Sequence, residues 1–112
     1  MHELALCEAI ADTVTQRAAG RRVSRVDVRI GHLRQVVPES LTYSWRMVTQ
    51  ETALAGAALD VEHVPAEIEC HSCGQRVVLD VPSFLCPDCL SEDVRVLQGD
   101  ELLLVSIELT AS

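Results

Sequence analysis

Cys70-His71-Ser72-Cys73 is followed by Cys86-Pro87-Asp88-Cys89 with twelve residues between them, and these two segments set the architecture of the chain. Two residues between thiols let one tight turn direct both sulfurs at a single point. Two such turns facing each other form a four-sulfur cage, which suits Zn²⁺ and leaves no open position for a substrate. The spacing therefore predicts a structural zinc site with the four cysteines as its ligands, Cys70, Cys73, Cys86 and Cys89.

The other residues of these segments have expected supporting roles. Gly74 directly follows the second thiol and permits the positive φ that a zinc knuckle needs, while Pro87 stiffens the second knuckle. His71 lies between two proposed ligands. We interpret it as a solvent-exposed or outer imidazole, and its ligation of the metal stays open as the alternative.

The composition limits the class of protein. The chain has 112 residues, of which 48% are hydrophobic and 3% aromatic, so it is long enough for one domain with an aliphatic core or one domain with a small satellite. No run of eighteen apolar residues is present, and the acidic chain start does not resemble a signal peptide. We therefore expect a cytoplasmic protein without membrane contact, whose paired cysteines bind metal instead of forming disulfides.

The charge is unevenly distributed along the chain. The formal net charge is −8, but residues 1–50 hold seven Arg against five acids while residues 51–112 hold two Arg against twelve acids. The acidic half repels phosphate, which argues against nucleic acid as a partner. An arginine cluster remains, which is either a solvated surface or a docking patch for an acidic protein; it consists of Arg21, Arg22, Arg25 and Arg29.

Hydrophobic periodicity predicts two helices and three strands outside the cysteine-rich segment. Apolar residues at helical spacing indicate a helix over residues 3–19, and Pro38 begins a second helix. Alternation predicts strands at 26–30 and 59–63. The most apolar strand, Leu102–Leu109, is expected to return to the first sheet and to lie centrally in it.

The segment 66–99 differs from the rest, because its elements are short and it contains the four spaced cysteines. A segment of this size cannot bury enough apolar surface to fold alone, so a structural metal has to stabilise it. We therefore predict an α/β (α+β) fold in which residues 1–65, completed by 100–112, form one domain and residues 66–99 form an inserted, zinc-ribbon-like domain.

The chain start, Met1-His2-Glu3, is a second candidate metal site. The terminal amine, the amide nitrogen of His2 and its imidazole can close adjacent chelate rings on one ion, and the amide of Glu3 can complete a square. A planar nitrogen field favours Ni²⁺ or Cu²⁺. Such a site is open and labile, which suits a carrier more than an enzyme.

Several motifs together resemble the HypA family of hydrogenase and urease nickel-incorporation metallochaperones. They are the Met-His-Glu-Leu start, Val28-Arg29-Ile30-Gly31, Pro38-Glu39-Ser40-Leu41, the run from Gly56 to Glu62, the two cysteine pairs, and the closing segment from Gly99 to Glu108. The resemblance covers essentially the whole chain in the correct order.

The resemblance implies two helices on a three-stranded sheet with an inserted zinc domain. It also implies Ni²⁺ bound through His2 with Glu3 beside it, and delivery to a [NiFe]-hydrogenase large subunit with help from an accessory GTPase. Some relatives also serve urease, whose accessory proteins are then partners. Other relatives carry an Asp near the metal where this chain has Pro38, which leaves open whether Glu39 supplies an extra carboxylate.

Two questions stay open at the level of sequence. A zinc-ribbon protein-interaction module without nickel transfer is the alternative function, and a thiol–disulfide oxidoreductase is a third. A monomer and a dimer are both compatible with the chain.

Three further residues with possible metal ligands are left out of the proposed sites. We interpret Cys7 as a buried core thiol, His32 as a loop residue and His63 as a packed or paired strand residue.

Overall fold

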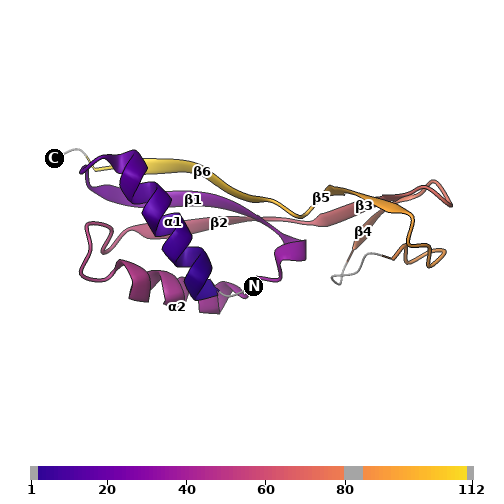
Figure 1. Ribbon diagram of the computed structural model, residues 1–112, viewed down its shortest axis with the longest axis horizontal. Helices are drawn as coiled ribbons and strands as arrows, with labels where there is room; N and C mark the ends of the chain where they lie inside the picture. The colour runs from indigo at the N-terminus through magenta and orange to yellow at the C-terminus, as the bar shows by residue number, and fades with distance from the viewer. Residues whose placement is uncertain (1–2, 80–84, 111–112) are drawn as a thin grey trace. The chain divides into compact units, whose positions relative to one another are not determined.

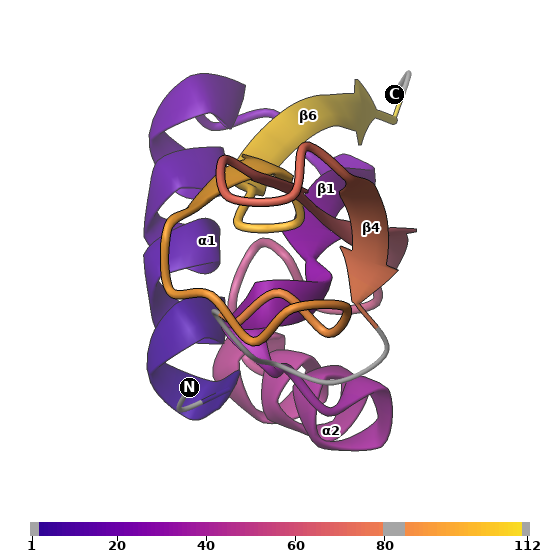
Figure 2. The same ribbon diagram turned by 90° about the vertical axis from the view of Figure 1, so that its right-hand side faces the viewer.

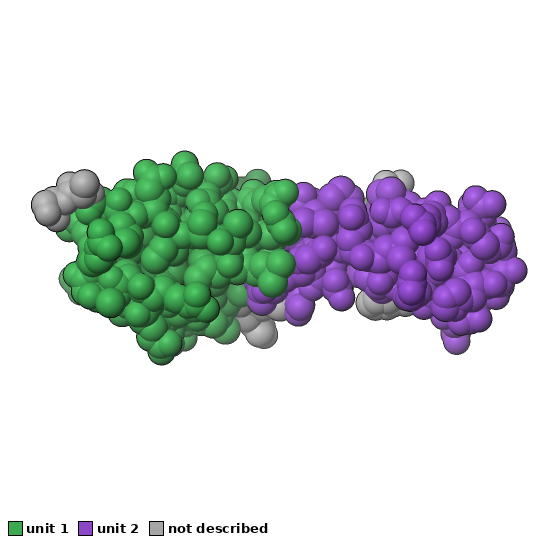
Figure 3. Space-filling model, turned by 90° about the horizontal axis from the view of Figure 1, so that it is seen from above, with its two compact units in different colours: residues 1–29, 36–62, 103–112 green, residues 30–35, 63–102 purple. Residues whose placement is uncertain are grey.

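The computed structural model describes residues 3–79 and 85–110 (Figure 1). The chain divides into two compact units, coloured separately in Figure 3. The first contains residues 1–29, 36–62 and 103–112, and the second contains residues 30–35 and 63–102. No helix in the described residues is long and apolar enough to cross a membrane.

The first sheet has three strands in the order β2-β1-β6, with bounds Ala58–Val64, Val23–Gly31 and Leu102–Leu109. β1 and β2 run in the same direction (Figure 1). The amide of Gly31 donates to the carbonyl of Glu101, and the amide of Thr110 donates to that of Arg22. These bonds join opposite ends of β1 and β6, so this pair is antiparallel.

The expected central position of the last strand is wrong. β1 is the central strand, and β6 lies at an edge with Leu103 and Val105 each about half exposed. The helix between β1 and β2 places β2 beside β1 as a parallel neighbour, which leaves only the other edge of β1 for β6. The apolar run in β6 therefore reflects one partly buried face and two exposed aliphatic side chains on the other.

The two helices contact each other and form the first core with the sheet (Figure 2). α1 spans Glu3–Ala18 and α2 spans Pro38–Thr49, which confirms both predicted helices. Helical spacing places the buried side chains of α1 on one face; they are Leu6, Cys7, Ile10, Val14 and Ala18.

The buried face of α2 differs at one position from the face that its apolar residues favour. Their spacing favours burial of Val48, but the structure buries Thr49. The Thr49 hydroxyl donates to the carbonyl of Trp45 at 2.7 Å, so its polar atom has a hydrogen-bond partner inside the core.

The second sheet has the order β4-β3-β5, and both pairs are antiparallel. Its strands are Arg76–Leu79, Ala66–Cys70 and Val94–Gln98. The buried core of this sheet contains only Ala66, Ile68 and Leu79 among the described residues, with four partly buried aliphatic residues around it. Such a small core gives little hydrophobic stabilisation, as expected for a unit that depends on a metal.

Two glycines permit a close approach of the backbone in the second unit. A Cβ on Gly31 would lie 2.0 Å from the carbonyl oxygen of Gly99, and a Cβ on Gly99 would lie 2.4 Å from the Cα of Ala66. Gly99 also has a φ of +105°, which other residues rarely adopt. The amide of Leu33 donates to the carbonyl of Gly99 at 2.8 Å, so the end of β1 is fixed against this turn.

Candidate metal centre

The first pair of cysteines lies on the turn between β3 and β4. Cys70 is the last residue of β3, and its amide donates to the carbonyl of Gln75 at 2.9 Å. The amide of Gly74 then donates back to the carbonyl of Cys70 at 2.9 Å, with Gly74 at a φ of +75°. The positive φ confirms the role predicted for this glycine.

The second pair repeats this geometry. The amide of Cys86 donates to the carbonyl of Ser91 at 3.0 Å, and the amide of Leu90 donates to the carbonyl of Cys86 at 2.7 Å. Leu90 takes the place of Gly74, with a φ of +60° and an exposed side chain. A left-handed conformation is costly for a residue with a Cβ, and a leucine does not adopt it by preference. We infer that the hydrogen bonds of the loop hold Leu90 in this conformation.

The two loops bring the four sulfurs into one cluster. The Sγ atoms of Cys70 and Cys89 are 3.6 Å apart and those of Cys73 and Cys86 are 3.7 Å apart, while all four lie within 4.8 Å of one another. A tetrahedral zinc site with Zn–S bonds of about 2.3 Å requires sulfurs about 3.8 Å apart. The cluster therefore fits Zn²⁺ in a closed four-thiolate cage.

The surroundings of two thiols in the cluster shift their pKa values in opposite directions. The amide of Cys73, together with the Cys89 thiol and the amide of Ser72, lowers the pKa of Cys70 to about 7 against the effect of desolvation. The amide of Ser91 favours the Cys89 thiolate, but the interaction with Cys70 and desolvation outweigh it and raise the pKa of Cys89 to about 12. Four thiolates this close together need a divalent cation, which holds coordinating thiols deprotonated.

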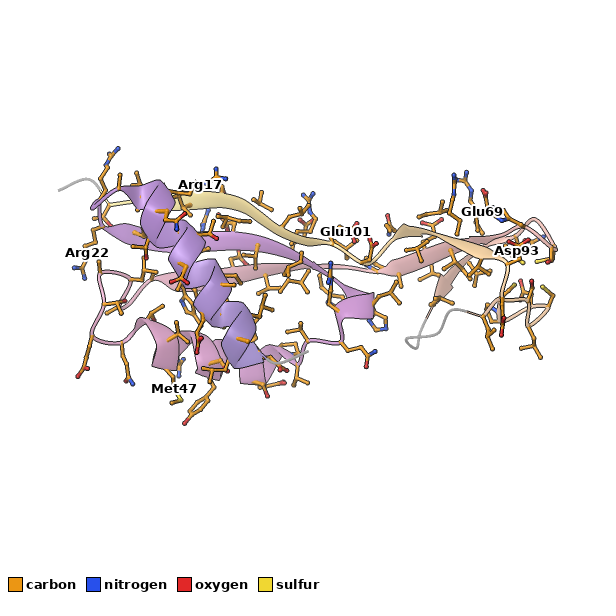
Figure 4. The ribbon with its side chains drawn as sticks, viewed as in Figure 1. Arg17, Arg22, Met47, Glu69, Asp93 and Glu101 are labelled. Carbon is orange, nitrogen blue, oxygen red and sulfur yellow. The ribbon has the colours of Figure 1, made fainter. Side chains whose placement is uncertain are left out.

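Polar side chains connect the two loops outside the sulfur cluster. His71 Nδ1 lies 3.1 Å from Asp93 Oδ1, and the Ser72 and Ser91 hydroxyl oxygens are 2.8 Å apart. Figure 4 shows where Asp93 and Glu69 lie on this unit. His71 is exposed and is not a member of the sulfur cluster, so the structure places it as an outer imidazole.

The other proposed metal site is described only in part, because Met1 and His2 lie outside the described residues. Glu3 is the first residue of α1, and its Oε1 accepts a hydrogen bond from the amide of Val37 at 3.2 Å. Val37 is the N-cap residue of α2, so Glu3 lies beside the first turn of that helix, where Glu39 is exposed. A carboxylate near a helix N-terminus is favourable.

Cys7 is a core residue, as predicted. Its side chain is fully buried, and its thiol donates weakly to the carbonyl of Leu41 at 3.5 Å. Burial and, secondarily, the charge of Glu3 raise the pKa of the Cys7 thiol to about 11. This thiol is therefore neutral at physiological pH, and only the thiolate is a good metal ligand.

His32 and His63 lie side by side, a contact that neither residue's place in the sequence predicts. Their ring centroids are 5.5 Å apart and nearly perpendicular, with His32 Nδ1 at 3.3 Å from His63 Nε2. The available signal was the position of each residue at the carboxyl end of a predicted strand, since those ends meet when neighbouring strands are parallel. Considered separately, neither position indicated the contact.

The sequence matches a known family along nearly its whole length. The family is described as "Hydrogenase/urease nickel incorporation, metallochaperone, hypA", and its model matches residues 1–109. The "Hydrogenase maturation factor HypA" of Desulfosudis oleivorans is 38% identical over 113 residues, covering 97% of this chain and 98% of that protein. The protein of the same name from Geobacter metallireducens is 35% identical over 108 residues, covering 96% and 98%.

Solved structures support the fold. The solution structure of the Ni metallochaperone HypA from Helicobacter pylori covers all of both chains with a TM-score of 0.67 at 24% identity. A second structure, described as the solution structure of HypA protein, covers 97% of this chain and 93% of that one with a TM-score of 0.59 at 23% identity. At these identities the similarity establishes the architecture alone.

Proposed function

Because the chain belongs to the HypA family of nickel metallochaperones in hydrogenase maturation, we propose that it binds Ni²⁺ at its N-terminus and delivers it to the [NiFe]-hydrogenase large subunit. The ligands are the amine of Met1, the amide and imidazole nitrogens of His2, and the amide of Glu3. The chemistry is ligand exchange, so no bond is made or broken in a substrate and the protein is not an enzyme.

The observation that carries this proposal is the match of the family along residues 1–109, which includes the Met1-His2-Glu3 start. The chemistry of that start supports it, because amine, amide and imidazole nitrogens favour Ni²⁺ or Cu²⁺. The hydrogen bond from the amide of Val37 to the Glu3 carboxylate supports it further, since it fixes the last residue of the chelate against the start of α2.

We assign the cysteine cluster to a resident Zn²⁺ with a structural role. Cys70, Cys73, Cys86 and Cys89 would fill all four positions of the metal, so this ion is retained while nickel is transferred. The proposed division is a nickel-binding domain of residues 1–65 completed by 100–112, with residues 66–99 as the zinc-binding domain. The zinc would stabilise the small second core.

The proposed partners are an accessory GTPase of nickel insertion and the hydrogenase large subunit, with urease accessory proteins as further clients, all in the cytoplasm. Residues 51–112 hold twelve acidic residues against two Arg, and this negative charge disfavours nucleic acid as a partner. A basic surface on a protein partner would complement the same acidic half.

Nickel calorimetry on untagged, zinc-loaded protein tests the nickel site. We expect one Ni²⁺ per chain, with binding lost after His2→Ala or after an N-terminal extension, because each removes part of the chelate. Mass spectrometry confirms the intact Met1 terminus beforehand. Unchanged affinity in both altered proteins would refute the site and favour a zinc-ribbon interaction module.

Delivery requires a separate experiment. Purified nickel-loaded protein is mixed with the nickel-free hydrogenase large subunit and the accessory GTPase, and nickel in the large subunit is measured after separation. We expect transfer from the unmodified chain and none from His2→Ala. Transfer that is equal for both proteins would show that nickel reaches the enzyme without this chelate.

A further inference from the structure

We propose that His32 and His63 form an additional divalent transition-metal site, separate from both the cysteine cluster and the chain start. His32 Nδ1 and His63 Nε2 are 3.3 Å apart. Two imidazole nitrogens that each bind a metal at about 2.05 Å and lie this far apart subtend an angle of about 107° at the metal, close to the tetrahedral value. The pair therefore has the spacing of a two-imidazole chelate.

Imidazole chemistry defines the class of ligand. Two neutral imidazole lone pairs cannot face each other without a shared proton or a cation between them, and a metal ion can take the place of the proton. Nitrogen ligands of this type suit Ni²⁺, Cu²⁺ and Zn²⁺ and bind Mg²⁺ or Ca²⁺ poorly. Water would occupy the remaining coordination positions, so the site would be open and exchangeable.

The backbone under both rings is well fixed, which lowers the entropic cost of chelation. His32 directly follows Gly31, whose close approach to Gly99 leaves no space for a Cβ. The carbonyl of His32 accepts a hydrogen bond from the amide of Gln35 at 3.2 Å.

The backbone near His63 is fixed as well. His63 precedes Val64, the last residue of β2, and the carbonyl of the next residue, Pro65, accepts a hydrogen bond from Gln98 Nε2 at 3.1 Å. Preorganised ligands bind more tightly than mobile ones.

Access and local charge also permit a cation. His63 is exposed and His32 is partly exposed, so solvent reaches the pair. The amide of Leu33, next to His32, donates to the carbonyl of Gly99, and the acidic residues Asp100 and Glu101 directly follow that glycine; Glu101 is labelled in Figure 4. The guanidinium of Arg34 opposes a cation here, but its Nε donates to the carbonyl of Asp100 at 2.8 Å and is thereby directed to that turn.

Metal titration of zinc-loaded full-length chain with an extended N-terminus tests the site, because the extension removes the proposed terminal chelate. Ni²⁺, Cu²⁺ and Zn²⁺ are added separately in competition with a chromophoric chelator. We expect one ion per chain, and a loss of affinity of about tenfold or more for His32→Gln and for His63→Gln, since either change leaves a single imidazole. The double variant should bind no more weakly than the weaker single variant.

His71→Gln is the matched control, because His71 is also exposed and also has a polar neighbour, Asp93. It should leave the affinity unchanged. Paramagnetic Ni²⁺ should broaden the ring resonances of His32 and His63 together at substoichiometric metal. Affinity within about twofold of the parent in both His32→Gln and His63→Gln would show that the pair is only hydrogen-bonded and would overturn the site. Neither result depends on the proposed N-terminal nickel site, which the extension removes.

Discussion

Leu90 and Gly74 occupy equivalent positions in the two knuckles. Both adopt the same left-handed backbone conformation, although one is a leucine and the other a glycine. Each donates its amide to the carbonyl of the first cysteine of its own pair, and each has a positive φ. Glycine adopts this conformation freely, whereas leucine is strained in it. The second knuckle therefore contains a local cost that the first one lacks.

Leu90→Gly should stabilise the zinc-loaded protein by about 1 kcal/mol, because it relieves the left-handed strain without removing a buried side chain. Gly74→Ala should have the opposite effect by about the same amount. The free energy of unfolding in denaturant, measured with zinc saturating, gives both values. Destabilisation by Leu90→Gly would show that the exposed leucine makes a contact worth more than the strain.

The Cys7 thiol should make the protein less stable at alkaline pH. Its pKa rises from 9.0 in the unfolded chain to about 11 in the folded chain. Between these values the unfolded state binds fewer protons than the folded state, so the free energy of unfolding falls as pH increases from 9 to 11, by up to about 2 to 3 kcal/mol. Below pH 9 the thiol is neutral in both states and has no effect.

Cys7→Ala provides the comparison, because alanine cannot titrate. The unmodified protein minus the variant should give a stability difference that is flat up to about pH 9 and then declines. Denaturant unfolding of zinc-loaded protein at a series of pH values measures it. Parallel curves for the two proteins above that pH would contradict the raised pKa.

At the scale of elements, the contact between Gly31 and Gly99 fixes where β1 ends and how the chain enters the last strand. Gly31 has an ordinary φ of −78°, so space alone and not backbone conformation requires glycine there. Gly99 is restricted by both space and a φ of +105°. Gly31 directly precedes His32, so this contact also determines the position of the backbone from which the His32 imidazole extends.

Gly31→Ala should destabilise the protein by at least about 2 to 3 kcal/mol, because the new methyl group would lie 2.0 Å from a carbonyl oxygen of the backbone. Gly20→Ala is the control. Gly20 has a φ of +86°, and a methyl group there would meet no atom within 4 Å, so only conformational strain of about 1 kcal/mol applies. Thermal and denaturant unfolding compare the two, and equal losses would contradict the steric explanation.

The elements could be predicted from the sequence more completely than their arrangement. Helical spacing and a proline located α1 and α2 to within one residue at the ends that were predicted, and the paired thiols indicated the metal cluster. The position of β6 could not be predicted from its composition, because an apolar strand can be central or can expose one face. The contact of His32 with His63 depends on strand pairing, which single positions do not encode.

At the scale of the whole molecule, the chain has two units with unequal sources of stability. The first has a core of helices and a sheet, whereas the second has, in its described residues, a core of three buried side chains and the sulfur cluster. A structural zinc contributes on the order of 10 kcal/mol in small metal-dependent domains. The second unit therefore depends on the metal in a way that the first does not.

Removal of zinc by a strong chelator should unfold the second sheet and leave the helices intact. Hydrogen exchange should show loss of protection in β3, β4 and β5 with protection retained in α1 and α2. Cys73→Ala should reproduce this pattern, while Cys7→Ala should retain zinc, because Cys7 is buried in the helical core and is not a member of the cluster. Full protection of the second sheet in metal-free protein would contradict a structural role for the ion.

The strand order of the first sheet also affects the time course of folding. β6 can pair with β1 only after the chain closes a loop that contains the whole second sheet, and closure of a long loop is entropically slow. The hydrogen bond from Gln98 to the carbonyl of Pro65 shows that the second sheet brings the chain that leaves β2 close to the chain that enters β6. Zinc should therefore act as a folding accelerator for a strand that supplies none of its ligands, and stopped-flow refolding should be faster with the metal present.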